Sequence, residues 1–399
     1  MRALRTGEHG APGAQSVPAG RPVHALNAEE VRRYSRHLLL PEIGEAGQQR
    51  LKGARVAIIG LGGLGSPAAL YLAAAGVGTL GLVDPDRVDV TNLQRQVLYS
   101  DADVGRPKCT VARERLTALN PGLAVEPFPV ALTAANALDI LREFDLILDG
   151  TDNFPTRYLV NDASVLLGVP NVHGSVLRFE GRVTVFGTPD GPCYRCLFPT
   201  PPPPESVPDC SDAGVLGVMP GQIGVLQATE AIKWITGVGE LLAGRLLLVD
   251  ALRMRFQTVA IRRDPGCPAC GTRELRELID YEEFCGVARP VQSAIARFTP
   301  HELAERLRGP EAPQLVDVRE PWEWSVARLP GAILVPLSQF EALAPNLDAT
   351  RETIVYCHHG SRSLAAAMQL EASGFDRVGH LEGGIDRWST EVDPALPRY

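Results

Sequence analysis

Four of the eight cysteines form two Cys-x-x-Cys pairs, Cys193 with Cys196 and Cys267 with Cys270, and the two pairs lie 74 residues apart. Four thiolates in this pattern are the ligand set of a closed, tetrahedral zinc site. Because protein sulfur would fill every position around the metal, no position remains for water or substrate. We therefore expect a structural Zn²⁺ that ties two distant segments together, in preference to unrelated or redox-active thiol pairs.

A glycine-rich segment, Gly60-Leu-Gly-Gly-Leu-Gly65, follows a short apolar run and precedes a helical pattern. Glycines here allow a tight turn and let phosphates approach the N–H groups at the start of a helix. The four candidate glycines are Gly60, Gly62, Gly63 and Gly65. Asp84 ends the next apolar run, where a carboxylate can bind ribose hydroxyls. On their own these features indicate a dinucleotide enzyme at least as strongly as an ATP enzyme.

Further polar residues favour ATP. Arg95 and Lys108 supply two cations suited to a triphosphate, and Asp152 supplies a hard oxygen ligand for Mg²⁺. The other polar candidates in the same stretches are Asp86, Asn92, Gln94 and Asn153. NAD binding requires none of these residues. The set therefore predicts a site for ATP and magnesium, in preference to a nicotinamide site or to ordinary surface salt bridges.

Cys357 directly follows an expected strand, and the loop Cys357-His-His-Gly-Ser-Arg362 leads into a helix. Backbone N–H groups and the start of the helix would stabilise a thiolate or persulfide, and Arg362 would add positive charge. A phosphatase is the rival interpretation, because its cysteine loop also binds an anion. Tyrosine-phosphatase-like loops place five residues between cysteine and arginine, whereas four separate Cys357 from Arg362. The tighter loop favours sulfur chemistry.

Cys210 is a second candidate nucleophile. It follows a segment that has six prolines in the eleven residues 198–208. Because proline disfavours both helix and sheet interiors, we expect an extended, mobile loop on which Cys210 could reach an acyl group. An incidental loop thiol is the alternative. Cys109 and Cys285 have no companion ligand or base, so we expect both to be buried or incidental.

The elements that would position the nucleotide site alternate along the chain. Apolar runs at residues 54–59, 79–83 and 144–148 predict strands, and residues 67–75 and 108–119 predict helices. Alternation of this kind is typical of an α/β fold with a mostly parallel, doubly wound, Rossmann-like sheet. The glycine turn and Asp84 would then lie at the carboxyl ends of neighbouring strands.

A second, smaller α/β domain is predicted near the C-terminal end. Residues 314–318, 332–335 and 353–356 read as strands, and residues 363–373 as a helix. The residues just before this domain, 286–296, show only weak hydrophobic periodicity, so we expect a linker there. The predicted organisation is a disordered tail at residues 1–25, an ATP-binding domain at 26–285, a linker at 286–296 and the small domain at 297–399.

Composition restricts the class of protein. The chain has 399 residues, 45% of them hydrophobic, and a formal net charge of −8. An acidic balance argues against nucleic acid or an anionic membrane as partner. The first 25 residues lack the apolar core of a secretory signal, and no apolar run reaches the roughly 20 residues of a transmembrane helix. We expect a cytoplasmic enzyme with reduced thiols.

At the nucleotide motifs, residues 27–285 resemble the molybdopterin-synthase and thiamine-biosynthesis adenylyltransferases (MoeB/ThiF-like) of the ubiquitin-activating-enzyme superfamily. The resemblance assigns to ATP and its metal the residues Gly62, Asp84, Asn92, Arg95, Lys108, Asp152 and Asn153. It also assigns Arg36 to the ATP site of the neighbouring subunit in a homodimer, so a monomer should be inactive. The zinc prediction agrees with this group.

Residues 297–395 resemble a single rhodanese domain through the motifs around Asp317, Ala332, Cys357 and Gly384. The combined resemblance implies that a ubiquitin-like sulfur-carrier protein ending in Gly-Gly is adenylated with ATP. Cys357, loaded as a persulfide by a cysteine desulfurase or thiosulfate, would then deliver sulfur with help from Cys210. The product would be a thiocarboxylate used for molybdopterin, thiamine, cysteine or thiolated-tRNA synthesis.

Three other functions remain open from the sequence. A nicotinamide dehydrogenase would not explain the presence of Arg95, Lys108 and the two cysteine pairs. A docking module would bind the carrier without catalysis. An adenylyltransferase with an inert rhodanese-like domain would perform the first step alone.

Overall fold

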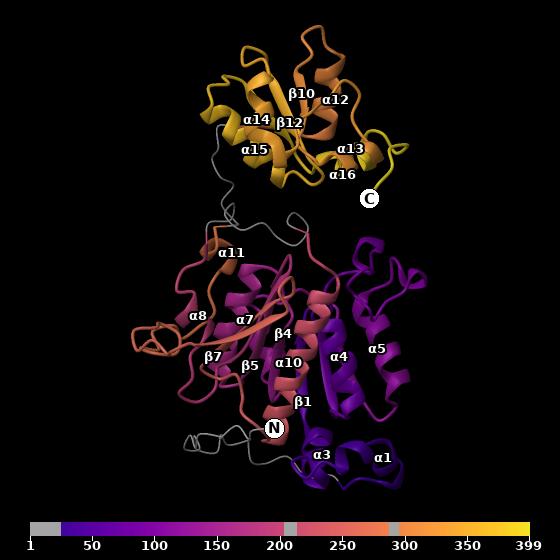
Figure 1. The fold of residues 1–399 in the computed structure, drawn as a ribbon, viewed down its shortest axis with the longest axis vertical. Coiled ribbons are helices and arrows are strands. Elements are labelled where there is room, and N and C mark those ends of the chain that lie inside the picture. Colours follow the sequence, from indigo (N-terminus) through magenta and orange to yellow (C-terminus); the bar gives the residue numbers. More distant parts are fainter. Residues whose placement is uncertain (1–24, 203–213, 287–294) are drawn as a thin grey trace, which may run out of the picture. The chain divides into compact units, whose positions relative to one another are not determined.

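The computed structural model describes residues 25–202, 214–286 and 295–399. They form two compact units, one of residues 25–202 with 214–286 and one of residues 295–399 (Figure 1). Most of the expected tail, Cys210 and residues 287–294 of the expected linker lie outside the described residues. Within the described residues, none of the helices combines the length and the apolarity needed to cross a membrane.

The described part of the N-terminal unit is built on an eight-stranded sheet in the order β3-β2-β1-β4-β5-β6-β7-β8. The strands are β1 (Arg55–Ile59), β2 (Thr79–Val83), β3 (Ala124–Phe128), β4 (Leu146–Asp149), β5 (Asn171–Leu177), β6 (Glu180–Phe186), β7 (Arg245–Asp250) and β8 (Arg255–Ala260). From β3 to β5 all neighbours are parallel, as predicted.

The remaining strands of this sheet pair antiparallel, from β5 through β6 and β7 to β8. This antiparallel half was not predicted. A two-residue turn at Arg178 and Phe179 joins β5 to β6, with Arg178 at φ 54°, and a turn so short allows only antiparallel pairing. The doubly wound fold is therefore confirmed, with an antiparallel extension on one side.

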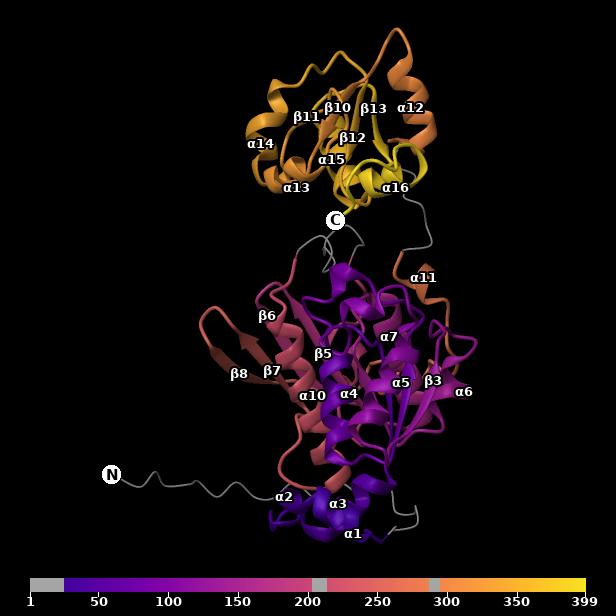
Figure 2. The same ribbon diagram turned by 90° about the vertical axis from the view of Figure 1, so that its right-hand side faces the viewer.

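Helices cover both faces of this sheet. In β1, Val56 and Ile58 pack into one core with residues of α4, α5 and α10, whereas Ala57 and Ile59 pack into a second core with residues of α6 and α7. Figure 2 shows α10 beside α4. The helices are α1 (Ala28–Arg33), α2 (Ser35–Leu38), α3 (Gly44–Gly53), α4 (Gly65–Ala75), α5 (Lys108–Leu119), α6 (Ala137–Leu141), α7 (Phe154–Leu167), α8 (Tyr194–Leu197), α10 (Val218–Thr236) and α11 (Tyr281–Phe284), with short 3₁₀ turns η1 (Val90–Asn92) and η2 (Asp101–Asp103).

The C-terminal unit contains a five-stranded sheet in the order β11-β10-β12-β13-β9, parallel throughout in the described residues. Its strands are β9 (Ala296–Phe298), β10 (Gln314–Asp317), β11 (Ile333–Leu334), β12 (Thr353–Tyr356) and β13 (Val378–Leu381). Its helices are α12 (Pro300–Arg308), α13 (Pro321–Val326), α14 (Phe340–Leu343), α15 (Ser361–Ala372) and α16 (Gly384–Glu391), with 3₁₀ turns η4 (Leu337–Gln339) and η5 (Ala344–Asn346). The short strands β9 and β13 were not predicted.

Candidate active site

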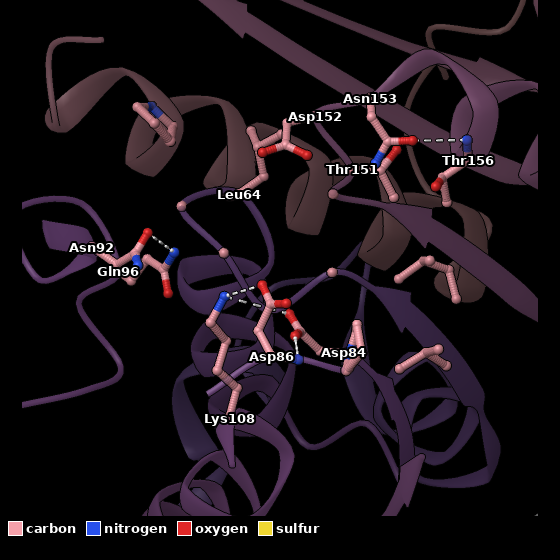
Figure 3. Close-up of a pocket in the computed structure, with 18 of the residues that line it drawn as sticks. Leu64, Asp84, Asp86, Asn92, Gln96, Lys108, Thr151, Asp152, Asn153 and Thr156 are labelled. Carbon is pink, nitrogen blue, oxygen red and sulfur yellow. Dashed lines mark hydrogen bonds and ion pairs between the residues drawn. The ribbon is translucent and has the colours of Figure 1, made fainter. Parts of the chain in front are cut away.

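A cavity of about 430 Å³ lies in the N-terminal unit, where β1, β2 and β4 end (Figure 3). It joins the glycine turn, the stretch after β2, the start of α5 and the loop after β4, because parallel strands end at the same edge of the sheet. The predicted residues that line it are Gly60, Gly62, Gly63, Asp84, Asp86, Asn92, Arg95, Lys108, Asp152 and Asn153. Most of the predicted nucleotide residues therefore surround one space.

Two predicted residues, Gly65 and Gln94, do not line this cavity. A Cβ atom added to Gly65 would lie 1.9 Å from the Gly60 carbonyl oxygen, so this glycine allows α4 to start close to β1. Gln94 is exposed and lies against Gly217, where an added Cβ would meet its Oε1 at 2.5 Å. The structure therefore gives Gly65 a packing role and places Gln94 outside the pocket.

Asp84 and Lys108 belong to one network beside the glycine turn. The Leu61 N–H donates to Asp84 Oδ2 at 2.7 Å, and the Asp86 N–H donates to Asp84 Oδ1 at 2.8 Å. Lys108 Nζ lies 2.8 Å from Asp86 and 4.0 Å from Asp84. Burial raises the pKa of Asp84, and the Lys108 charge opposes that rise. The carboxylate expected to bind ribose thus also holds the glycine turn.

Gln96 lines the cavity but was not predicted. It is 3% exposed; its Nε2 donates to Asn92 Oδ1 at 3.0 Å, and its Oε1 has no hydrogen-bond partner among the described residues (Figure 3). Arg95 donates to the same Asn92 oxygen at 2.9 Å. The Gln96 N–H also bonds to the Asn92 carbonyl, so one helical turn brings the two side chains together. In the sequence, the spacing of four residues between Asn92 and Gln96 could have indicated this pairing.

Asp152 and Asn153 lie on the loop after β4, which the buried Asp149 holds in place. His173 Nδ1 lies 2.7 Å from Asp149, and the Thr151 hydroxyl donates to it at 2.6 Å. Burial alone would raise the pKa of Asp149, but the contacts with His173 and Thr151 outweigh it and hold the pKa below its usual range. Asp152 is exposed at the cavity, and Asn153 caps the start of α7.

The four sulfur atoms of the two cysteine pairs converge in the N-terminal unit. All lie within 4.8 Å of one another, with Cys193 and Cys267 at 3.6 Å and Cys196 and Cys270 at 3.3 Å. Four sulfur ligands about 2.3 Å from a tetrahedral zinc ion would be about 3.8 Å apart. These cysteines could therefore hold one metal ion, and they connect α8 to the turn at residues 267–270.

Cys357 is buried where β12 ends, and the Gly360 N–H donates to its Sγ at 3.0 Å. Gly360 has φ +106°, which glycine adopts readily and other residues rarely. A Cβ added to Gly384 would lie 2.2 Å from the His358 carbonyl oxygen. The Gly-Gly motif near the start of α16 therefore lets that helix pack closely against the Cys357 loop.

Arg362 was expected to add positive charge at the sulfur, but its guanidinium is bound by Glu323. Two of its nitrogens lie 2.7 and 2.8 Å from the carboxylate oxygens. Burial would raise the pKa of Glu323, yet the Arg362 contacts outweigh it and lower that pKa. The Tyr399 hydroxyl donates to Glu323 at 3.0 Å, and the Tyr399 ring stacks on His358. Much of the Arg362 charge is thus balanced by a carboxylate.

Arg36, Cys109 and Cys285 are not among the residues that line the cavity. Arg36 is exposed on α2 and is not among the residues that line the cavity of its own chain. Cys109 and Cys285 are buried, as predicted, and burial raises the pKa of each thiol to about 11. Cys210 lies outside the described residues.

Comparison with protein families matches residues 34–269 to the ThiF family and residues 299–391 to the rhodanese-like domain. Among curated proteins, the chain is 48% identical to "Probable adenylyltransferase/sulfurtransferase MoeZ" of Mycobacterium tuberculosis, over 96% of this chain and 98% of that protein. It is 44% identical to "Adenylyltransferase and sulfurtransferase MOCS3" of Bos taurus, over 100% of this chain and 93% of that protein.

The N-terminal part has relatives of its own. "Sulfur carrier protein adenylyltransferase" of Thermus thermophilus is 57% identical, over 65% of this chain and 98% of that protein. Among solved structures, E. coli MccB with SeMet MccA is similar with a TM-score of 0.54 and 25% identity, over 60% of this chain and 74% of that chain. The structural likeness supports the fold of the N-terminal unit.

Proposed function

The chain belongs to the ThiF family and carries a C-terminal rhodanese-like domain, and we propose that it adenylates a ubiquitin-like sulfur-carrier protein ending in Gly-Gly and then delivers sulfur to it. The observation that carries the first step is the convergence of the glycine turn, Arg95, Lys108 and Asp152 on one cavity. The buried Cys357, whose sulfur accepts a hydrogen bond from the Gly360 N–H, supports the second step.

In the first step, ATP binds with its ribose at Asp84 and its phosphates at the glycine turn. Arg95 and Lys108 offset the negative charge of the triphosphate, and Asp152 is the carboxylate that would hold Mg²⁺. A terminal carboxylate oxygen of the carrier attacks the α-phosphorus, the bond to the β-phosphate oxygen breaks, and pyrophosphate leaves. The product is an acyl adenylate, in which the carbonyl carbon is a good electrophile.

In the second step, Cys357 carries a persulfide supplied by a cysteine desulfurase or thiosulfate. The outer sulfur attacks the acyl carbon and AMP leaves, so carrier and Cys357 become joined through an acyl disulfide. The Cys210 thiolate then attacks Cys357 Sγ, which releases the carrier thiocarboxylate and leaves a Cys210–Cys357 disulfide for a thiol reductant. A transient thioester at Cys210 is the alternative order of covalent steps.

Two further assignments belong to this proposal. The four-cysteine cluster holds Zn²⁺, which would supply structural stability and no chemistry, because all four ligands are protein thiolates. Arg36 reaches the ATP site of the neighbouring subunit in a homodimer. Arg36 is exposed and is not among the residues that line its own chain's cavity, and both observations support that assignment.

ATP–pyrophosphate exchange tests the proposal. The wild type, Asp152→Ala and Cys357→Ala should be compared with carriers ending in Gly-Gly. We expect carrier-dependent exchange in the wild type and in Cys357→Ala, and its loss in Asp152→Ala. Thiocarboxylate formation should be lost in both variants.

Two outcomes would contradict the proposal. If no carrier supports exchange, the adenylation step is wrong. If Cys357→Ala still forms thiocarboxylate at the wild-type rate, the rhodanese-like domain is inert and the chain is an adenylyltransferase alone.

A further inference from the structure

A buried histidine with an incomplete set of hydrogen bonds lies next to the Cys357 loop. His380 is on β13, 5% exposed, opposite Val355 of β12 in the strand register. Its Nδ1 lies 3.4 Å from Ser363 Oγ, and its Nε2 has no hydrogen-bond partner among the described residues. A buried imidazole with one unpaired nitrogen is costly, and the fold keeps this one beside Ser363, which itself contacts the Cys357 sulfur.

Ser363 connects this histidine to Cys357. The hydroxyl lies 3.5 Å from Cys357 Sγ, donates to the Gly360 carbonyl oxygen at 2.9 Å and lies within reach of His380. A hydroxyl has a single proton, so Ser363 can donate to only one neighbour at a time. A neighbour that donates into Ser363 Oγ therefore influences where the hydroxyl proton points.

The charge state of His380 follows from its surroundings. Burial, with a smaller contribution from the Arg297 charge, lowers its pKa to about 4, and Glu382 and the Gly360 backbone oppose this with smaller effects. Arg297 lies opposite His380 on β9, and Glu382 follows β13. The ring is therefore neutral near pH 7 and has one N–H. The Gly360 backbone also offers an acceptor near the ring, and Ser363 Oγ lies 3.4 Å from Nδ1, so that proton is best placed on Nδ1.

We propose that His380 is a positioning residue for sulfur transfer: its Nδ1–H donates to Ser363 Oγ and directs the Ser363 hydroxyl toward the sulfur on Cys357. The inference rests on the proposed role of Cys357 as the sulfur carrier. When Cys357 is a thiolate or persulfide, the sulfur accepts hydrogen bonds from both Ser363 and the Gly360 N–H. No proton is transferred, and the histidine acts only through the serine.

The experiment measures the rate at which iodoacetamide labels Cys357 across pH 5 to 10 in the full-length protein, followed by mass spectrometry of the Cys357 peptide. His380→Phe keeps a ring of similar size without a donor. His380→Asn places an amide N–H near the Nδ1 position, whereas His380→Gln, the matched control, extends its amide toward the Nε2 position. Ser363→Ala and the double variant with His380→Phe complete the set.

We expect His380→Phe, His380→Gln and Ser363→Ala each to slow labelling about tenfold at pH 7 and to raise the midpoint of the pH profile by about one unit, as for loss of one hydrogen bond to a charged group. His380→Asn should restore much of the wild-type profile. The double variant should be no slower than Ser363→Ala alone, because the histidine acts through the serine.

An unchanged pH profile in His380→Phe, or additive losses in the double variant, would overturn the inference. Circular dichroism tests whether each variant is folded. If His380→Phe is unfolded, the labelling profiles of His380→Asn and His380→Gln are compared, and equal profiles would overturn the inference. The yield of Cys357 persulfide from thiosulfate in the wild type is measured separately. The same yield is measured with a cysteine desulfurase and cysteine as the donor. Absence of the persulfide with both donors would contradict the proposed function, while the labelling profiles would still decide whether His380 acts on Cys357.

Discussion

At the scale of single residues, the side-chain oxygen of Gln96 in the cavity of the N-terminal unit is a candidate hydrogen-bond acceptor for the nucleotide. Gln96 is buried there, and among the described residues its Oε1 has no hydrogen-bond partner, while its amide nitrogen donates to Asn92. An acceptor fixed in this way suits a donor on the nucleotide. Ligand binding would then satisfy a group that is costly to leave unpaired.

Gln96→Leu is accordingly expected to raise the KM for ATP about tenfold with little change in kcat, because a ground-state contact is lost. The measurement is pyrophosphate exchange as a function of ATP concentration. Gln94→Leu is the matched control, since Gln94 is exposed and lies outside the cavity lining. Equal effects of the two substitutions would show that Gln96 has no special contact with the nucleotide.

His380 also makes the C-terminal unit sensitive to acid. Burial lowers its pKa to about 4, whereas the unfolded ring takes up a proton near pH 6.5. Between these values the unfolded state binds more protons, so the free energy of unfolding falls as the pH drops from about 6.5 to about 4, by about 1–3 kcal/mol for this ring.

Urea unfolding followed by tryptophan fluorescence at pH 7.5 and pH 5 checks this prediction. Three of the four tryptophans, Trp322, Trp324 and Trp388, lie in the C-terminal unit and report its unfolding. His380→Phe should show a smaller loss of stability between the two pH values than the wild type. The same loss in both proteins would mean that another group is responsible.

At the scale of elements, the cysteine cluster connects two segments that are far apart in sequence. Cys193 caps the start of α8 and Cys196 lies within it, and Cys267 and Cys270 lie in a tight turn after β8. Residues around the cluster are buried, but they contribute few large apolar side chains of their own. A metal ion is therefore expected to supply much of the stability of this region.

One zinc ion per chain is expected from elemental analysis, and Cys267→Ser should lose it. A strong chelator should lower the Tm of the N-terminal unit by several degrees, because metal binding there stabilises only the folded state. Cys109→Ser is the control, since Cys109 is buried away from the cluster and should leave the zinc content unchanged. Full zinc content in Cys267→Ser would contradict the assignment.

At the scale of the whole molecule, the proposed ATP site requires two chains if Arg36 comes from the partner subunit. Arg36 is exposed and is not among the residues that line the cavity of its own chain. If Arg36 of the partner subunit completes the site, then a dimer has two shared sites, each with its Asp152 from one chain and its Arg36 from the other.

Mixing variants tests this arrangement. Arg36→Ala and Asp152→Ala should each be inactive, but co-expression in equal amounts should recover about one quarter of the wild-type exchange activity. Half of the dimers are then mixed, and each mixed dimer has one intact site. No recovery despite proven mixed dimers would place Arg36 outside the partner's site.

Local sequence determined much of this protein. The strands β1, β2 and β12 and the helix α5 follow from short apolar runs and their spacing, because such runs must be buried whatever the rest of the chain does. The convergence of most residues predicted for ATP on one cavity was also predictable, since they follow the ends of parallel strands. The two Cys-x-x-Cys pairs indicated their own convergence through ligand spacing.

Tertiary structure alone decided the rest. The roles of Gly65, Asp149 and His380 depend on which strands and turns become neighbours, and that depends on contacts between residues far apart in the chain. Gln94 and Gln96 differ in the same way, because the backbone turn points one side chain to solvent and the other into the cavity. Side-chain chemistry is readable from residue type, whereas direction and partners are properties of the packed chain.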